Sequence, residues 1–276
     1  MGRRLARDRV TLTALVLIAG IAAAAALAPL LAPYDPHAVD PPRRLEPPSR
    51  AHWLGTDELG RDVFSRLLYG ARISMTVGLV ATGIGLMSGV LVGVCAGYFR
   101  RADNLLMRLV EILMAIPSIL LALAIVTALG PGLYNVMIAV GVGALPAFAR
   151  LTRAAVLGLR EMEFVQAARA IGATDLHIVG RHILRNALPP VLVYASLHMA
   201  GSILAASILS FLGLGVQPPT AEWGAMVSGA RAYLREAPFL STIPSLAIFV
   251  VVMSFNLLGD GLRDLLDPRL RGTLGT

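Results

Sequence analysis

The chain contains no lysine, because all 24 of its strongly basic residues are arginines. A phosphate-binding loop of the Walker A type places a lysine on the nucleotide phosphates, so the sequence excludes an ATP site of that type. Schiff-base chemistry on a lysine side chain is excluded for the same reason. The single cysteine, Cys95, allows no disulfide within the chain. We therefore expect neither nucleotide hydrolysis nor an internal disulfide.

Charged residues are also scarce, at 15% of the chain, against about 25% in an ordinary soluble protein. Hydrophobic residues make up 56%, and the mean hydropathy is +0.72. Six apolar runs have about the length that a membrane-crossing helix needs. These predicted spans are Val10–Leu31, Ile73–Tyr98, Leu109–Leu129, Leu133–Ala149, Val191–Leu212 and Phe239–Leu258. An all-α integral membrane fold follows, because helices satisfy their own backbone groups in lipid.

The first run is longer than the apolar region of a signal peptide, so we interpret it as a retained span. If the N-terminus is cytoplasmic, the inner segments hold 16 of the 24 arginines and the outer segments hold 8. The positive-inside rule favours this topology, with both termini cytoplasmic and the chain crossing the cell membrane several times. The net charge of +7 then indicates contact with anionic lipid headgroups, with no nucleic-acid partner.

This topology divides the chain into four parts. Residues 1–9 form a cytoplasmic N-terminus, and 10–72 hold the first transmembrane helix with a long outer segment. Residues 73–266 form a core of five transmembrane helices, and 267–276 form a cytoplasmic tail. Within the core, the segment 150–190 is the one long polar interruption.

The outer segment begins rich in proline and then changes character near Thr56. Either Thr56 or Asp57 is suited to cap a helix. Leu59, Val63 and Leu67 would lie on one side of that helix. The pattern predicts a surface helix against the bundle or the membrane.

The second span carries glycines at four-residue spacing. Gly85, Gly89, Gly93 and Gly97 share one helix face, where small residues let another helix approach closely. Glycine is also simply frequent in membrane helices. The regular spacing favours a packing face, within this chain or against another subunit.

The polar segment 150–190 predicts two short amphipathic helices joined at Gly172. In the second of them, Leu176, Val179 and Ile183 share a face by helical spacing. A glycine at the end of the first helix supplies the left-handed conformation that such ends often need. The polar stripe consists of His177, Arg181 and Arg185.

No catalytic or metal site emerges from the remaining polar residues. His198 and Met199 lie together in the fifth span, where a hydrogen-bonded packing histidine competes with a metal or pore site. Glu111 lies near the inner end of the third span, close enough in sequence to pair with Arg108.

The sequence QAARAIGATDLHIVGRHIL, from Gln166 to Leu184, resembles the EAA loop of the membrane subunits of ABC-type importers. Ala167, Ala168 and Gly172 match that pattern. Gln166 stands where glutamate is usual, and the expected proline near the end of the motif is an arginine. Three further segments, Gly55–Ser74, Ser210–Gly224 and Asn256–Arg269, resemble the dipeptide/oligopeptide/nickel permease family, specifically its C-type subunit.

This resemblance implies the six-helix transmembrane domain of a type I ABC importer. Such a chain pairs with a second, B-type permease to form a heterodimeric pore. Two ATPase subunits hold ATP and magnesium, so this chain would need no cofactor, and an extracytoplasmic binding protein delivers the substrate. The EAA segment docks on an ATPase, and we therefore name residues 150–190 the coupling loop. The implied docking residues are Gln166, Ala167, Ala168, Gly172, Ala173 and Asp175.

The family resemblance leaves the substrate open. Di- and oligopeptides are our first interpretation, and nickel or a metal chelate is the alternative. A membrane scaffold without transport would explain the spans and a docking loop, but not the family signatures near both ends of the chain.

Overall fold

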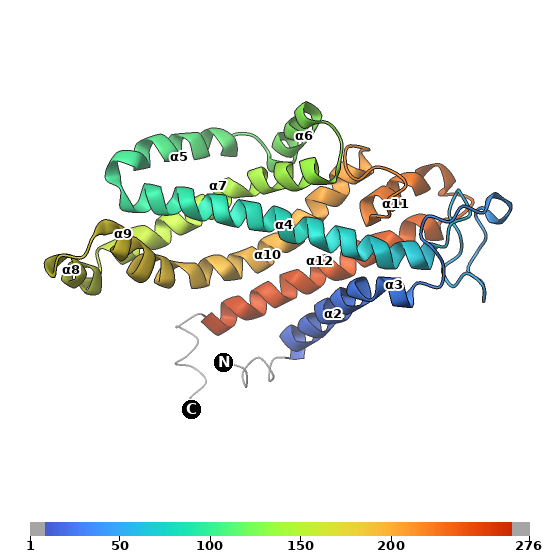
Figure 1. Ribbon diagram of the computed structural model, residues 1–276, viewed down its shortest axis with the longest axis horizontal. Coiled ribbons are helices and arrows are strands. Elements are labelled where there is room, and N and C mark those ends of the chain that lie inside the picture. The colour runs from blue at the N-terminus through green and yellow to red at the C-terminus, as the bar shows by residue number, and fades with distance from the viewer. Residues whose placement is uncertain (1–8, 267–276) are drawn as a thin grey trace.

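The computed structural model describes residues 9–266, and this part of the chain is helical with no β-strand. The helices pack side by side into an elongated bundle (Figure 1). The all-helical membrane fold expected from the apolar runs is confirmed. The first eight residues of the predicted cytoplasmic N-terminus and the predicted tail 267–276 lie outside the described residues.

Within the described range, five helices are long and apolar enough to cross a membrane, and one bent pair could form a sixth span. The long helices are α2 (Arg9–Ala26), α4 (Val63–Tyr98), α7 (Leu133–Arg160), α10 (Leu184–Phe211) and α12 (Phe239–Leu266). The shorter helices are α3 (Ala28–Leu31), α5 (Arg100–Met114), α6 (Ser118–Leu129), α8 (Glu163–Ala170), α9 (Asp175–His177) and α11 (Trp223–Ala230). Three further helical turns are η1 (Pro41–Arg43), the π-helical η2 (Ile178–Ile183) and η3 (Arg231–Tyr233).

The second span is longer than predicted, because α4 already begins at Val63. Its N-cap is Asp62, whose carboxylate accepts a hydrogen bond from the backbone N–H of Ser65 at 2.7 Å. The predicted surface helix capped by Thr56 or Asp57 is wrong, since both residues precede α4 in irregular structure. The helix expected to lie on the surface is instead the outer part of a span.

The third predicted span, Leu109–Leu129, is also wrong as a single helix. Helix α5 ends at Met114, α6 begins at Ser118, and the two are bent by 90°. Pro117 accounts for the break, because proline lacks a backbone N–H and disfavours the helical conformation in the residue before it. At 12 residues, α6 is about 18 Å long and cannot cross a hydrocarbon core of about 30 Å by itself.

The core is built around α4, α7 and α10. One cluster at the outer half joins these helices to α6 through buried aliphatic side chains, among them Val77, Val126, Val140 and Leu209. Helix α2 lies beside α12 (Figure 1), and a Cβ added to Gly261 of α12 would meet the Thr11 side chain of α2. The start of α2 and the end of α12 therefore lie together.

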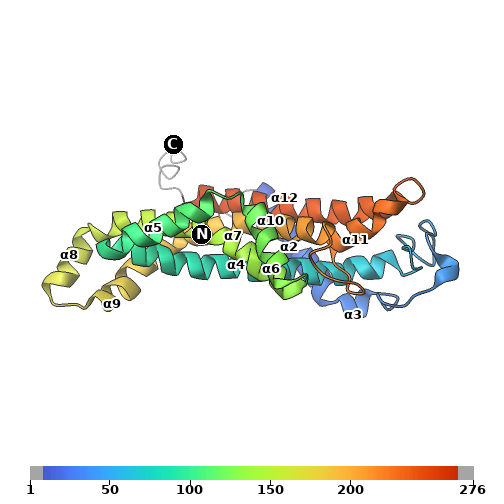
Figure 2. The ribbon, with the colours of Figure 1, turned by 90° about the horizontal axis from the view of Figure 1, so that it is seen from above.

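The two ends of the bundle differ in structure. One end carries α8 and α9, and the other carries residues 33–62, which are largely irregular, together with residues 213–238, which include α11 (Figure 1). We name this second, irregular end the outer cap. The coupling loop and the outer cap also lie at opposite ends when the bundle is turned (Figure 2). The start of α2 and the end of α12 point toward the end that carries the coupling loop.

Candidate functional site

The coupling loop forms a compact tip at one end of the bundle. Helix α7 continues to Arg160, α8 follows after a short turn, and the chain then reverses into α9. Val165 and Ala168 of α8 are buried against Ile178 and Ile183 of the returning segment. Because two limbs of the loop share one apolar cluster, the tip is able to move as a unit.

Gly172 ends the first limb, and its φ of +84° confirms the predicted left-handed conformation. The N–H of Ala173 donates to the carbonyl of Ala168 at 3.0 Å, and the N–H of Gly172 donates to that of Arg169 at 2.9 Å. These two bonds form a Schellman motif, and Ala173 packs against the apolar cluster that contains Ala168. The local sequence thus determines the reversal.

The second limb is not a separate short helix. From Asp175 the chain runs continuously to Phe211, and η2 contributes a π-helical turn with an i→i+5 pattern. This turn shifts the register, so Ile178 and Ile183 are buried while Leu176 is 83% exposed. The predicted apolar face of Leu176, Val179 and Ile183 is therefore wrong at Leu176.

Tyr98, the last residue of α4, holds both limbs of the coupling loop. Its hydroxyl donates a hydrogen bond to the Asp175 carboxylate. The Arg169 guanidinium donates to the Tyr98 oxygen at 3.3 Å and lies 5.5 Å from the centre of its ring. The hydrogen bond with Tyr98 raises the pKa of Arg169 above its ordinary value, so the guanidinium stays charged. Arg160 adds a bond to the carbonyl of Gly97 at 2.9 Å.

The tip exposes two large apolar side chains among polar ones. Ile171 is 86% exposed and Leu176 is 83% exposed, on either side of the turn at Gly172. Exposed large apolar residues on a water-facing tip indicate a protein contact. Of the predicted docking residues, Gln166, Ala167 and Gly172 are exposed, whereas Ala168 is buried inside the loop. Asp175 is exposed but binds Tyr98.

Sequence reasoning missed both Tyr98 and the pair Ile171 and Leu176. Tyr98 lies far from the loop in sequence, so no local pattern connects it to Asp175. For Ile171 and Leu176, the sequence contained a partial signal, because both are bulky apolar residues close to the predicted turn at Gly172. Residues that flank such a turn lie at the end of the bundle, where no neighbouring helix buries them.

The four-glycine face of α4 packs against α7 within this chain. The two helices run parallel, and each successive glycine of α4 faces the next turn of α7. A Cβ added to Gly85 would lie 2.5 Å from the Cβ of Ala144, and one added to Gly89 would overlap the Cβ of Phe148. At Gly93 the added atom would lie 2.5 Å from the carbonyl oxygen of Ala149, and at Gly97 it would lie 2.8 Å from the Cβ of Val156. Any side chain on this face would push the two helices apart.

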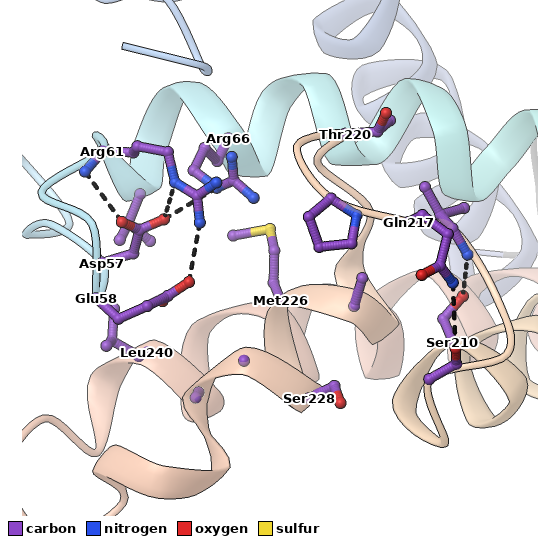
Figure 3. Close-up of a pocket in the computed structure, with 17 residues that line it drawn as sticks. Asp57, Glu58, Arg61, Arg66, Ser210, Gln217, Thr220, Met226, Ser228 and Leu240 are labelled. Atoms are coloured by element: carbon purple, nitrogen blue, oxygen red, sulfur yellow. Dashed lines mark hydrogen bonds and ion pairs between the residues drawn. The ribbon is translucent and has the colours of Figure 1, made fainter. Parts of the chain in front are cut away.

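The outer cap contains a pocket of about 270 Å³ between the start of α4 and α11 (Figure 3). Four charged side chains line it, and they neutralise one another. Arg61 pairs with Asp57 at 2.7 Å and with Glu58 at 2.9 Å, and Arg66 pairs with Asp57 at 3.2 Å. Since each charge already has a partner, the cluster serves to hold the cap on α4.

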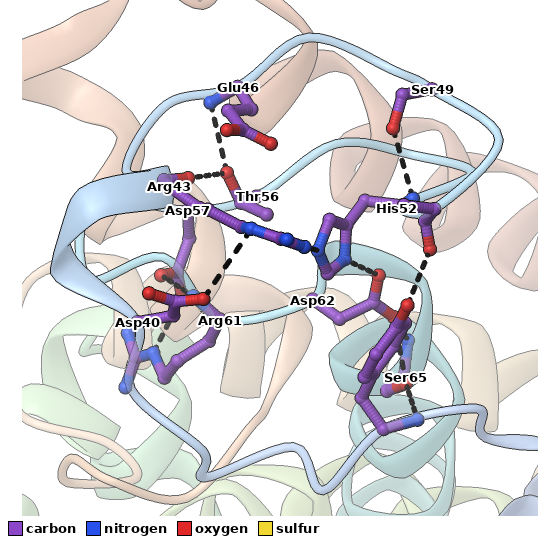
Figure 4. A network of polar contacts seen from close by, with 12 residues as sticks. Asp40, Arg43, Glu46, Ser49, His52, Thr56, Asp57, Arg61, Asp62 and Ser65 are labelled. Carbon is purple, nitrogen blue, oxygen red and sulfur yellow. Dashed lines mark hydrogen bonds and ion pairs between the residues drawn. The ribbon is translucent and has the colours of Figure 1, made fainter.

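A second polar network ties the irregular segment to the same helix end (Figure 4). His52 Nδ1 lies 2.9 Å from Asp62 Oδ1, while Asp62 Oδ2 accepts from the Ser65 hydroxyl at 2.7 Å. Arg43 Nη1 lies 3.4 Å from His52 Nε2. Donation from Nδ1 to the carboxylate leaves Nε2 free to accept from Arg43. Asp62 thus caps α4 and orients a buried histidine.

The ionisable groups near or within the membrane do not form a metal site. His198 lies against the rings of Phe148 and Tyr194, each with its ring centre within 6 Å. Met199 packs in a different cluster, around Trp223. In residues 9–266, no group of three metal-binding side chains meets. The expected pair of Glu111 with Arg108 is not formed in this range, and α5 is held instead by Asp103, which binds Arg153 at 2.6 Å.

Two family descriptions match the sequence. Residues 85–272 match the family described as binding-protein-dependent transport system inner membrane component. Residues 1–48 match the N-terminal transmembrane domain of oligopeptide transport permease C.

Curated relatives match along almost the whole chain. A glutathione transport system permease protein of Pectobacterium atrosepticum is 46% identical over 98% of this chain and 90% of its own length. A probable D,D-dipeptide transport system permease protein of Escherichia coli is 46% identical over 95% of this chain and 88% of its own. A dipeptide transport system permease protein of Alkalihalophilus pseudofirmus is 44% identical, with 98% and 89% covered.

Solved structures share the fold. An inward-facing MetNI methionine ABC transporter superposes with a TM-score of 0.59 at 21% identity, over 74% of this chain and 98% of that one. An amino acid ABC transporter superposes with a TM-score of 0.56 at 16% identity, over 74% and 95%. The predicted transmembrane fold of an ABC importer is confirmed.

Proposed function

This chain belongs to the family of binding-protein-dependent transport system inner membrane components, and from that premise we propose that it forms half of the pore through which an importer takes up peptides. The chain is a membrane-spanning permease subunit of an ABC transporter. It is not an enzyme, since ATP hydrolysis resides in separate subunits. The substrate, the partners in detail and the roles of single residues are the proposal.

Peptide substrates are supported by what the relatives are named for. Glutathione, D,D-dipeptides and dipeptides are all short compounds with amide bonds. The chain is about equally similar to each of these relatives, which favours the shared chemistry over any single substrate. Nickel or a metal chelate is the alternative that the test must separate.

Coupling through residues 150–190 is the second part of the proposal. The exposed apolar pair Ile171 and Leu176 is the observation that carries it. In our proposal this tip inserts into a surface of an ATPase subunit, where burial of two large aliphatic side chains contributes to binding. The predicted residues Gln166, Ala167 and Gly172 surround the tip, while Ala168, Ala173 and Asp175 hold its shape.

The remaining partners follow from the same assignment. A second, B-type permease completes the pore, two ATPases bind the coupling loop side, and an extracytoplasmic binding protein docks on the outer cap. Both termini are cytoplasmic in this proposal, because the start of α2 and the end of α12 point toward the end that carries the coupling loop. We also keep the division into an N-terminal part, residues 10–72, and a permease core, residues 73–266, as a proposal.

The test is uptake by the complete transporter in proteoliposomes. The chain is reconstituted with its partner permease, both ATPases and the binding protein, and the uptake of a labelled dipeptide, a labelled tripeptide and radioactive nickel is compared. We expect ATP-dependent uptake of peptide that requires the binding protein. Uptake of nickel with no uptake of peptide would reverse the choice of substrate.

A further inference from the structure

A cavity of about 330 Å³ lies between the middle parts of α10 and α12. Three of its lining residues have polar side-chain groups at membrane depth, namely Tyr194 and His198 of α10 and Asn256 of α12. His198 lies near the middle of α10, which runs from Leu184 to Phe211. The rest of the lining is aliphatic or glycine.

These three polar groups have unused hydrogen-bonding capacity. In the part of the chain that the structure describes, neither the Tyr194 hydroxyl nor the Asn256 amide has a hydrogen-bond partner. The Thr82 hydroxyl donates to Ser202 Oγ at 3.0 Å, and His198 Nδ1 lies 3.3 Å from that oxygen. Since the Ser202 hydroxyl accepts from Thr82, its own proton is available to Nδ1, and the neutral ring then presents Nε2–H as a donor.

Polar groups without partners are costly in a bilayer, where they face either protein or a water-filled cavity. Elsewhere in the described spans, the serine and threonine side chains commonly bond to the carbonyl of their own helix. The hydroxyl of Ser254, two residues before Asn256 in α12, donates to the Val250 carbonyl at 2.7 Å. Two buried hydroxyls of the spans, Thr152 Oγ1 and Ser207 Oγ, also lack a partner, but Tyr194, His198 and Asn256 gather at one cavity.

The cavity continues toward the outer cap. A second, apolar groove between α10, α11 and α12 shares Leu204 and Val252 with it. Phe211 and Phe249 line that groove further outward. Together the two hollows follow one face of α10 along much of its length.

We propose that Tyr194, His198 and Asn256 form a binding station on the translocation path, where the amide backbone of a passing peptide is hydrogen-bonded. This inference rests on the proposed function. A hydroxyl, an imidazole N–H and a carboxamide together offer donors and an acceptor, which suit the C=O and N–H of a peptide group. The station has no acidic or arginine side chain. It therefore binds the peptide backbone and does not select among peptide side chains.

The first test measures KM and kcat for peptide uptake by the reconstituted transporter. Tyr194→Phe and Asn256→Leu each remove hydrogen bonding while keeping the size of the side chain. The loss of one such bond raises KM by about three- to tenfold. We expect the double variant to show a larger effect, with unchanged assembly and unchanged ATPase activity in the presence of the binding protein.

Two matched variants are the controls. Tyr134→Phe makes the same change at an exposed tyrosine at the start of α7, and Ser254→Ala removes a hydroxyl of α12 that bonds to its own helix. Both should transport peptide with the wild-type KM. Wild-type KM values in the Tyr194 and Asn256 variants would overturn the station.

The second test asks whether the cavity is wet in the complete complex. In a Cys95→Ser background, single cysteines replace Asn256 and Gly201, and nothing lies within 4 Å of a Cβ at Gly201. A small hydrophilic thiol reagent should label both, and excess dipeptide should slow labelling at least about twofold. A cysteine at Met87, which is 70% exposed on α4, is the control and should not respond to peptide.

Failure of the station and failure of peptide transport are distinguishable. If the wild-type complex takes up no peptide but the cavity cysteines are labelled, the proposed function is wrong. If the wild type takes up peptide while neither cavity cysteine is labelled or protected, the partner permease fills this cavity and the inference is wrong.

Discussion

The Tyr98 hydroxyl at the end of α4 donates a hydrogen bond to the Asp175 carboxylate at the start of α9. These residues are 77 positions apart in the sequence. The bond joins the coupling loop directly to a span that the chain reaches only through α5, α6 and α7. Movement of the loop therefore has a short route to α4, independent of the covalent connection.

The first prediction concerns this contact. Tyr98→Phe should keep the transporter assembled but weaken the link between ATP hydrolysis and uptake, because the ring stays packed while the hydroxyl is lost. Asp175→Asn retains an acceptor oxygen and should behave nearly as wild type, whereas Asp175→Ala should resemble Tyr98→Phe. The ratio of ATP hydrolysed to peptide imported is the measurement. An unchanged ratio in Tyr98→Phe would remove the contact from the coupling route.

The exposed tip gives the second prediction. Ile171→Asp and Leu176→Asp should each reduce the binding of the ATPase subunits at least about tenfold, since a charge would be partly desolvated in an apolar contact. Membrane insertion and pairing with the second permease should be unaffected. The control is Leu234→Asp, the same change at an exposed leucine of the outer cap. Co-purification of the ATPases from membranes measures the effect, and equal recovery in all three variants would contradict the docking role.

The third prediction tests the packing of α4 on α7. Gly89→Ala should destabilise the chain by about 1–3 kcal/mol, because the added Cβ would overlap Phe148. Gly83→Ala is the matched control on the same helix, where nothing lies within 4 Å of the added atom. It should be neutral or stabilising by about 0.5–1 kcal/mol, as expected for this change inside a helix. Thermal unfolding in detergent compares the two, and equal midpoints would show that the helices separate at no cost.

The fourth prediction concerns the cap of α4. Asp62→Ala removes the acceptor for the Ser65 N–H and leaves the buried His52 without its carboxylate partner. We expect the free energy of unfolding to fall by about 2–3 kcal/mol. Asp40→Ala removes an exposed carboxylate that lies 3.7 Å from Arg43, and should cost less than about 1 kcal/mol. Similar unfolding midpoints for both variants would show that the network around Asp62 is dispensable.

Topology provides the fifth prediction. Single cysteines at Thr220 and at Ile171, in a Cys95→Ser background, should react oppositely with a membrane-impermeant reagent added to whole cells. Thr220 lies in the outer cap and should be labelled, while Ile171 should react only after the membrane is opened. Labelling of both positions in intact cells would overturn the orientation.

The sequence predicted the helical class, the glycine face and the turn at Gly172 because each depends on residues close together in the chain. A period of four on one helix, or a glycine after a helix end, is a local signal. The bend at Pro117 was signalled too, but a run of apolar residues across it suggested one continuous span. Apolar length alone cannot distinguish a straight helix from two helices joined at a corner.

Other features depend on distant contacts and leave no local pattern. The π-helical turn at Ile178–Ile183 moved Leu176 out of the buried face, because an extra residue per turn changes which side chains align. From the sequence alone, Tyr98 is only the last residue of a predicted apolar span. Its bond with Asp175 exists only because α4 and the coupling loop end at the same place. The cavity at Tyr194 and Asn256 similarly requires two helices, α10 and α12, that are separated in the chain by α11 and its flanking loops.

Helix α4 has mechanical consequences for a transport cycle. It is one unbroken helix of 36 residues without proline, about 54 Å long, which is well beyond the hydrocarbon thickness of about 30 Å. Asp62 fixes its outer end, Tyr98 fixes its inner end, and α7 supports its glycine face. Such an element can tilt or slide, but it cannot shorten or fold. In the proposed transporter, a displacement of α4 at the coupling-loop end would therefore be passed along the helix to the outer cap.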